Sequence, residues 1–261
     1  MYDLHCHASF SADPATFAQL IGNSDLQVLS ATVTPDDYAL ACTFYGSVPH
    51  IRIATGLHPW KIDADEKASE TMTEKLLSTI EDTSYVGEVG LDFSPKHAHA
   101  KDAQLRSFER ILAACAELGG KVITIHSVRA ANACLDLIEK TRCLETCSCI
   151  MHWFSGSSDE LARAIKLGCY FSVGECSLKT KRGPEYVRAI PKGRLLLETD
   201  LPEDPASNTS PVLEPEKQAQ VEFDKLSTSL NYALETILKL TSRHTRFSIE
   251  AASQELLTRK V

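Results

Sequence analysis

The sequence predicts an α/β protein, a TIM (β/α)8 barrel whose C-terminal helical end is short or distorted. Two observations lead to this fold class. Eight short strand-like runs alternate with helical patterns within 261 residues, the order that such a barrel requires. In addition, side chains that bind metal ions stand where several of these strands end. Catalytic groups of this fold lie at the carboxyl ends of its strands.

The predicted strands are short apolar runs. They cover residues 2–7, 27–34, 51–57, 84–91, 121–126, 148–154, 169–174 and 194–200. Helices are predicted where apolar residues recur at spacings of three and four. The clearest runs from Asp102 to Leu118 and ends at Gly119-Gly120, because two glycines terminate a helix. Similar patterns cover 68–81, 129–140, 158–167, 219–240 and a last stretch near 248–259.

Composition and length suit a folded protein with a substantial core. Hydrophobic residues make up 43% of the chain, and its length suits one large domain or two small ones. We expect a single barrel over residues 1–261. No segment approaches the roughly 20 apolar residues that cross a bilayer. The nine cysteines are odd in number, which favours reduced thiols and a soluble, cytoplasmic protein without membrane contact.

The net charge of −8 argues against a protein that coats nucleic acid through a basic surface. It does not exclude a nuclease. Two divalent cations would add four positive charges within the pocket itself, where the local field matters more than the total charge.

Six side chains are candidates for metal ligands. The pair His5 and His7 ends the first strand, and alternation places both imidazoles on one face. A carboxylate such as Glu88, which follows Val86-Gly87, is costly to bury unless it is paired or metal-bound. Any single histidine could instead be a hydrogen-bonded core residue, but their joint placement favours one metal site. The set is His5, His7, Glu88, His126, His152 and Asp200.

Other polar features have weaker interpretations. A second pair, His97-Ala98-His99, lies in a polar loop and is predicted to be solvated. The cluster Lys179-Thr180-Lys181-Arg182 is predicted to be a solvated loop, and Trp60 and Trp153 either pack the barrel mouth or stack on bases. The stretch from Pro202 to Pro215 either borders the pocket as a lid or wall, or is a plain surface connection.

The chain resembles the TatD-like metal-dependent hydrolases and deoxyribonucleases, a branch of the amidohydrolase-like barrel enzymes. Several segments in the same order carry this resemblance. They are His5-Cys6-His7, Gly56-Leu57-His58-Pro59, Val86 to Asp92, Ile125-His126-Ser127, His152 to Gly156, and Leu195 to Pro202. Asp13-Pro14 and Thr32 to Pro35 also resemble the nucleases of Qat antiphage operons, which implies a role in antiviral defence and protein partners in a defence complex.

The chain departs from the family pattern at several places. Ala8-Ser9 replaces the usual Leu-Asp, and His126-Ser127-Val128-Arg129 has one residue more than the common His-Ser-Arg. The family's Arg and Asn-Glu-Pro segment is not recognisable in 203–215. We therefore expect substrate contacts at that rim to differ from those of the family.

The resemblance implies a binuclear site. His5, His7 and Asp200 would hold one metal, His126 and His152 the other, and Glu88 would bridge them. The mixed imidazole and carboxylate ligands suit two divalent ions of zinc, manganese or magnesium. Such a pair lowers the pKa of a shared water towards neutrality. Asp200 and Glu88 are thus the expected catalytic residues.

The implied activity is hydrolysis of DNA phosphodiester bonds, exonucleolytic on single strands or ends, by a metal-activated hydroxide. The expected phosphate contacts are His58 and Arg129, with Lys61 and, if it is not merely solvated, the Lys179-Lys181-Arg182 cluster further out. Two other functions remain open. One is hydrolysis of a small amide, ester or lactone, since this barrel serves several chemistries. The other is a subunit that is activated by partners in a larger complex.

Overall fold

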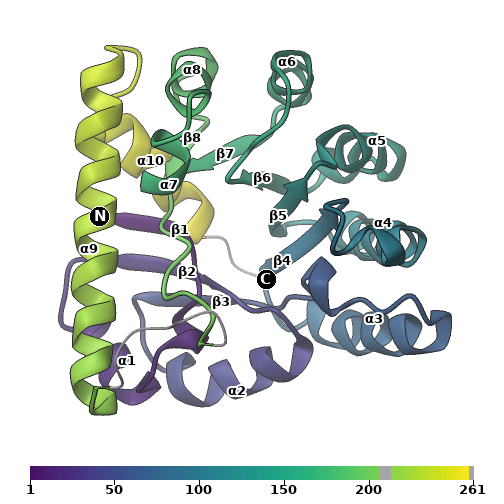
Figure 1. Ribbon diagram of the computed structural model, residues 1–261, viewed down its shortest axis with the longest axis horizontal. Coiled ribbons are helices and arrows are strands. Elements are labelled where there is room, and N and C mark those ends of the chain that lie inside the picture. The colour runs from purple at the N-terminus through teal and green to yellow at the C-terminus, as the bar shows by residue number, and fades with distance from the viewer. Residues whose placement is uncertain (206–212, 259–261) are drawn as a thin grey trace.

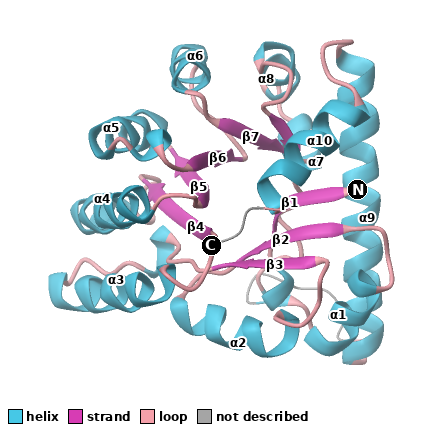
Figure 2. Cartoon of the chain, turned by 180° about the vertical axis from the view of Figure 1, so that it is seen from behind, coloured by secondary structure: helices cyan, strands magenta, loops and turns pink. Residues whose placement is uncertain are grey.

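The computed structural model describes residues 1–205 and 213–258, and these form the predicted barrel. Parallel strands lie in the centre and helices surround them, as Figures 1 and 2 show from opposite sides. The TIM-barrel fold class is confirmed. The nine cysteines are free thiols, as expected, and only Cys42 and Cys176 are exposed. Within the described part of the chain, no helix combines the length and apolar character needed to cross a membrane.

All eight predicted strands are present, and they form two parallel arcs. The first arc has the order β1-β2-β3 and the second the order β4-β5-β6-β7-β8. The arcs meet through the Thr55–Val86 bridge and through Asp200 N–H, which donates to His5 O at 3.0 Å. The strands are β1 (Tyr2–Cys6), β2 (Gln27–Ala31), β3 (Ile51–Ala54), β4 (Tyr85–Asp92), β5 (Val122–Val128), β6 (Ser148–His152), β7 (Tyr170–Val173) and β8 (Leu195–Leu197).

Every predicted helix is found, and the described residues contain four further α-helices that the periodicity did not predict. The unpredicted helices are α1 (Pro14–Gly22), α2 (Pro35–Tyr45), α7 (Glu175–Leu178) and α8 (Gly183–Ala189). The predicted ones are α3 (Glu66–Ile80), α4 (Lys101–Leu118), α5 (Ala131–Thr141), α6 (Ser158–Leu167), α9 (Pro215–Leu240) and α10 (Arg246–Leu257).

The C-terminal helical end is not short. Helix α9 has 26 residues and starts at Pro215, before the apolar pattern begins. Proline suits the first helical position because its missing N–H has no partner there in any case. Helix α9 runs along one side of the molecule (Figure 1) and packs on α1, α7 and α8. The 12 residues of α10 follow it.

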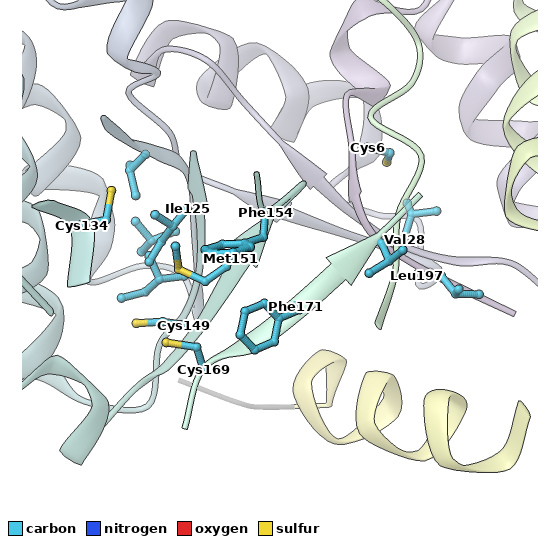
Figure 3. Close-up of a cluster of buried hydrophobic side chains, with 14 of the residues drawn as sticks. Cys6, Val28, Ile125, Cys134, Cys149, Met151, Phe154, Cys169, Phe171 and Leu197 are labelled. Atoms are coloured by element: carbon cyan, nitrogen blue, oxygen red, sulfur yellow. The ribbon is translucent and has the colours of Figure 1, made fainter. Parts of the chain in front are cut away.

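The core has an outer and an inner part. The outer part lies between strands and helices, and Figure 3 shows Cys149, Met151 and Phe171 within it. The inner part is an apolar layer inside the barrel, which α10 covers with Ala252, Leu256 and Leu257. We call this layer the floor. Its strand residues are Leu4, Leu29, Ala54, Tyr85, Val122, Ile150, Tyr170 and Leu196.

Candidate metal centre

The six predicted ligands come together above the floor. His7 Nε2 lies 3.1 Å from Asp200 Oδ1, and His5 Nε2 lies 3.7 Å from the same atom. These three residues place one ligand atom each within 4.8 Å of one another. The strand ends thus bring residues 5 and 200 side by side, as expected for neighbouring strands β1 and β8.

Glu88 lies between two groups of histidines. Its Oε2 is 3.4 Å from His5 Nε2 and 3.5 Å from His7 Nε2. Its Oε1 is 2.7 Å from His126 Nδ1 and 3.9 Å from His152 Nε2. One carboxylate therefore faces histidines on both sides through different oxygens, as a bridging ligand needs. Among the described residues it completes two groups of possible ligands, His5-Glu88-His152 and His58-Glu88-His126, and none joins His126 to His152.

The residues fit a metal centre on independent grounds. His5 is fully buried, and its Nε2 has no hydrogen-bond partner. Glu88 is 2% exposed and is surrounded by imidazoles rather than by a permanent cation. Unpaired polar atoms and buried carboxylates are costly unless a ligand completes their coordination. Imidazole nitrogens with carboxylate oxygens suit zinc or manganese.

Each of the four histidines is held from behind by an atom of a neighbouring element. His5 Nδ1 lies 2.6 Å from Thr124 Oγ1, and His7 Nδ1 lies 3.1 Å from Ala31 O. His152 Nδ1 lies 2.7 Å from Glu198 Oε2. His126 Nε2 lies 3.3 Å from Asp92 Oδ2. Such contacts fix the ring orientation and the tautomer of a metal-binding histidine.

Glu198 is a functional residue that the sequence reasoning missed. It is 2% exposed, and besides His152 it accepts hydrogen bonds from Ser172 Oγ–H and from Trp153 N–H. It stands two residues before Asp200 and two after the floor residue Leu196. That alternation is the signal that could have identified it, because it predicts that Glu198, directly after β8, points to the same side as Leu196 and Asp200.

Asp3 is a second missed residue. It is fully buried and accepts hydrogen bonds from His5 N–H at 3.1 Å and from Thr199 Oγ1–H at 2.6 Å. Burial raises the pKa of this carboxyl to about 8, although the bonds from Thr199 and His5 oppose that shift. Asp3 therefore ties β1 to the turn that carries Asp200.

Two glycines allow the backbone around Glu88 to pass close to β5. A Cβ at Gly87 would lie 2.1 Å from Thr124 Cγ2, and one at Gly90 would lie 2.1 Å from His126 O. Both have φ above +140°, a region that L side chains rarely adopt. Any larger residue would push β4 away from β5 and separate Glu88 from His126.

The carboxylates and histidines shift each other's pKa values in opposite directions. Burial disfavours protonation of His7, but its hydrogen bonds to Asp200 and Glu88 outweigh burial and raise its pKa to about 10. Burial opposes the charge of His152 as well, yet Glu198 and Asp200 raise its pKa to about 10. Asp200 is lowered to a pKa of about 2 because His152 and His7 outweigh its burial. Without a bound metal, protonated His7 and His152 therefore form ion pairs with the ionised carboxylates of the site.

The site opens into a cavity of about 920 Å³. Trp60, Lys61, Lys96 and His97 line one side of it, and Glu203 and Asp204 line another. His97 is therefore not simply solvated, as the sequence led us to expect, because its ring stacks on Trp60. His99 is exposed. Of the stretch 203–215, Glu203 and Asp204 border the cavity, whereas residues 206–212 lie outside the described residues.

The two predicted phosphate contacts differ in placement. His58 is buried within the cluster, with Nε2 3.3 Å from Glu88 Oε1. Arg129 is exposed and is not among the residues that line the cavity. In the basic cluster, Lys179 pairs with Glu175 and Arg182 donates to Gly156 O. Lys61 and Lys96 are the lysines that reach the cavity.

Comparison with protein families adds an independent observation. Residues 2–247 match the family described as TatD related DNase. The chain is 39% identical over 116 residues to "Deoxyribonuclease Tat-D" of Schizosaccharomyces pombe, covering 44% of this chain and 37% of that protein. It is 32% identical over 151 residues to the "3'-5' ssDNA/RNA exonuclease TatD" of Edwardsiella piscicida, covering 56% of each. The matches thus span 37% and 56% of the length of these two curated relatives.

Solved structures agree on the fold. A TatD family hydrolase from Entamoeba histolytica matches with a TM-score of 0.69 at 15% identity, covering 98% of this chain and 97% of that one. The TatD homologue YJJV from Escherichia coli K12 matches with a TM-score of 0.67 at 23% identity, covering 98% and 95%. At these identities the likeness concerns the arrangement of the chain alone.

Proposed function

Because the chain belongs to the TatD-related DNase family, we propose that it is a metal-dependent hydrolase of DNA phosphodiester bonds, acting on single strands or ends. The observation that carries this proposal is Glu88, whose two oxygens face separate groups of histidines at the base of an open cavity. Residues 1–261 would form one catalytic domain, since β1 and the turn after β8 supply adjoining ligands.

The proposed centre holds two divalent ions of zinc, manganese or magnesium. His5, His7 and Asp200 would hold one ion, His126 and His152 the other, with Glu88 shared. When bound, the ions would supply an activated hydroxide and neutralise charge on the phosphate. The chain itself would fix the orientation of the four histidine rings and leave the nitrogen that faces each ion free of a proton. The contacts that do this come from Thr124, Ala31, Glu198 and Asp92.

His58 has a different role from the other histidines. Its Nδ1 accepts the backbone N–H of Trp60 at 3.1 Å, so the neutral ring carries its hydrogen on Nε2. Burial lowers the pKa of His58 to about 4, which keeps the ring neutral. We therefore assign His58 as a hydrogen-bond donor to a non-bridging phosphate oxygen rather than as a metal ligand.

Asp200 is suited to orient an attacking water at the open side of the metal centre and to accept its proton. Its side chain is 28% exposed, whereas those of His5 and Glu88 are almost completely buried. Its low pKa of about 2 keeps it ionised at neutral pH. A carboxylate at this position can orient an attacking water and take its proton.

The same residues are compatible with a small-molecule hydrolase, because the cavity volume of about 920 Å³ falls in the range of ordinary ligand pockets. Two features favour nucleic acid. The family match concerns DNases, and lysines reach the cavity despite the negative net charge. The E. piscicida relative is named for single-stranded DNA and RNA.

A role in antiphage defence is a narrower prediction. It depends on Asp13-Pro14 and Thr32 to Pro35, and both segments have local structural roles. Asp13 caps α1 by accepting from Ala15 N–H and Thr16 N–H, and Thr34 caps α2. Phage challenge of cells that carry the protein or its Asp200→Asn variant tests the role, since protection should require Asp200.

The activity is tested with single-stranded DNA labelled at either end, with manganese, magnesium or zinc supplied. We expect metal-dependent shortening from one end that chelation and Asp200→Asn both abolish. Glu81→Gln, on an exposed residue at the end of α3, is the matched control. Turnover of simple esters or amides without DNA cleavage would replace the proposal by a small-molecule hydrolase. Inactivity of a protein shown to hold two metals would point to a partner-activated subunit.

A further inference from the structure

Trp60 lies at the mouth of the cavity and is held in one orientation while half exposed. Its Nε1–H donates to Asp92 Oδ2 at 2.6 Å. One face stacks on His97, with ring centroids 5.1 Å apart and planes at 12°. The side chain nevertheless remains 50% exposed. Packing of the barrel alone does not require an indole whose edge is fixed by a buried carboxylate and whose surface is open.

The charged residues around the cavity are divided between its two sides. Lys61 and Lys96 follow β3 and β4, beside Trp60, whereas Glu203 and Asp204 follow β8. Strands β4 and β8 stand across the barrel from one another, so the two sides oppose each other. Lys96 Nζ lies 5.7 Å from the centre of the Trp60 ring. Glu203 pairs with Lys225, so the attraction of a negatively charged chain comes from Lys61 and Lys96 on the side that carries Trp60.

We propose that Trp60, backed by His97, is a stacking platform for an unpaired nucleobase, with Lys61 and Lys96 contacting the flanking phosphates. This inference rests on the proposed nuclease function and names a binding subsite for its substrate. The Trp60 ring centre is 4.6 Å from that of His58 and 6.0 Å from that of His126. The stacked base therefore belongs to a nucleotide next to the phosphate at the metal centre.

The platform selects single strands for a physical reason. A base inside a duplex already has both faces covered by its neighbours, whereas an unpaired terminal base can place a face on the indole. Stacking on an aromatic side chain accepts any base, because every base has a π face. The subsite would thus favour unpaired ends without reading sequence.

Fluorescence tests the platform directly. The chain contains two tryptophans, Trp60 and Trp153, so Trp153→Phe leaves Trp60 as the sole indole. In this background, with Asp200→Asn to prevent cleavage, we expect a short thymidylate strand to quench the emission. A strand of equal length and charge whose terminal residues are abasic should bind without that quenching. Equal quenching by both strands, or none while anisotropy of a labelled strand reports binding, would overturn the proposal.

Kinetics of the active chain provide the second test. Trp60→Ala should raise KM for thymidylate strands roughly tenfold or more, with a smaller effect on kcat, and Trp60→Phe should recover most of the loss. The abasic strand should be insensitive to both changes. An equal loss on both substrates would assign Trp60 a structural role only.

The two proposals fail in different ways. If the unaltered chain cleaves neither strand, the nuclease function fails and the fluorescence titration still decides whether Trp60 binds bases. If the unaltered chain cleaves but Trp60→Ala does not distinguish the two strands, the nuclease function stands and the platform is wrong.

Discussion

The floor and the metal centre are two layers of one barrel interior, and the same strands build both. Strand β5 supplies Val122 to the floor and His126 to the metal centre, and β6 supplies Ile150 and then His152. Residues two apart on a strand share a face, so position along the strand decides which layer a side chain joins. The floor consists of apolar groups without directional partners, whereas every histidine above it has one.

Because of this difference, we expect substitutions in the two layers to affect different properties of the protein. Apolar packing depends on volume and buried area, so substitutions in the floor should act on stability. Ligand geometry depends on individual hydrogen bonds, so substitutions above it should act on metal binding and turnover. The distinction would be wrong if floor substitutions mainly changed metal binding, or if substitutions at the metal centre mainly changed stability.

The largest effect is expected at Glu88, because it faces both groups of histidines. Glu88→Gln removes the shared charge, and we expect kcat to fall roughly a thousandfold or more, several kcal/mol of transition-state stabilisation. Metal analysis of the purified variant should find fewer than two ions per chain. Retention of more than a tenth of the activity would show that Glu88 is not shared between ions.

A large loss of stability is expected in the floor. Leu196 is fully buried, and Leu196→Ala should lower the free energy of unfolding by about 2–5 kcal/mol. The turnover of the folded fraction should change little, since no metal ligand is lost. Urea denaturation compares it with Leu238→Ala, whose side chain is 40% exposed. Equal destabilisation by the two variants would contradict the assignment of Leu196 to the floor.

An intermediate effect is expected at Glu198, which lies between the layers. Glu198→Gln keeps the shape of the side chain but removes the charge that faces His152 Nδ1. We expect metal affinity to fall about 10- to 100-fold, with little change in the fold seen by circular dichroism. Competition with a chelator measures the affinity, and the exposed Glu185→Gln is the control. Unchanged affinity would mean that Glu198 acts on folding alone.

The pH dependence of the metal-free protein provides a prediction that needs no substitution. Folded His7 and His152 keep protons up to a pKa of about 10, whereas a histidine in the unfolded chain has its usual pKa of 6.5. Between pH 6.5 and about 10 the folded chain therefore binds more protons than the unfolded chain. The free energy of unfolding should fall as the pH rises through this range, by at most about 1.4 kcal/mol per pH unit for each histidine. His58, with its pKa lowered to about 4, gives the opposite slope below 6.5.

Below pH 6.5, Asp3 opposes the slope from His58, because burial raises its pKa to about 8. The decline above pH 6.5 should therefore be the main pH dependence of the metal-free protein. Urea denaturation between about pH 5 and 9 tests this. Excess manganese or zinc should remove the decline at high pH, because metal binding displaces the protons. A stability that rises steadily from pH 7 to 9 without metal would contradict the assigned shifts.

The sequence predicted the barrel because apolar runs mark its strands and the ligands stand at their ends. It missed α1 and α2, although Asp13 and Thr34 precede prolines at their first positions, a recognised start signal. Helices α7 and α8 have four and seven residues, too few to show a helical period.

The site was predictable in its ligands but not in the supports that come from distant elements. Thr124 lies 119 residues from His5, and Glu198 lies 46 from His152, so no local pattern joins them. The stack of His97 on Trp60 depends on two loops that meet only in the folded barrel. Arg129 follows an added residue and has a positive φ of 54°, a local backbone geometry that a motif does not reveal.

Helix α10 also has a consequence for synthesis. Its residues Ala252, Leu256 and Leu257 complete the floor, and Leu257 O accepts a hydrogen bond from Tyr85 O–H at 2.7 Å. While a ribosome has translated only the first 240 residues, Leu4 and Leu29 still face water through the open end of the barrel. Nascent chains would therefore be vulnerable to aggregation and to chaperone capture until this helix emerges.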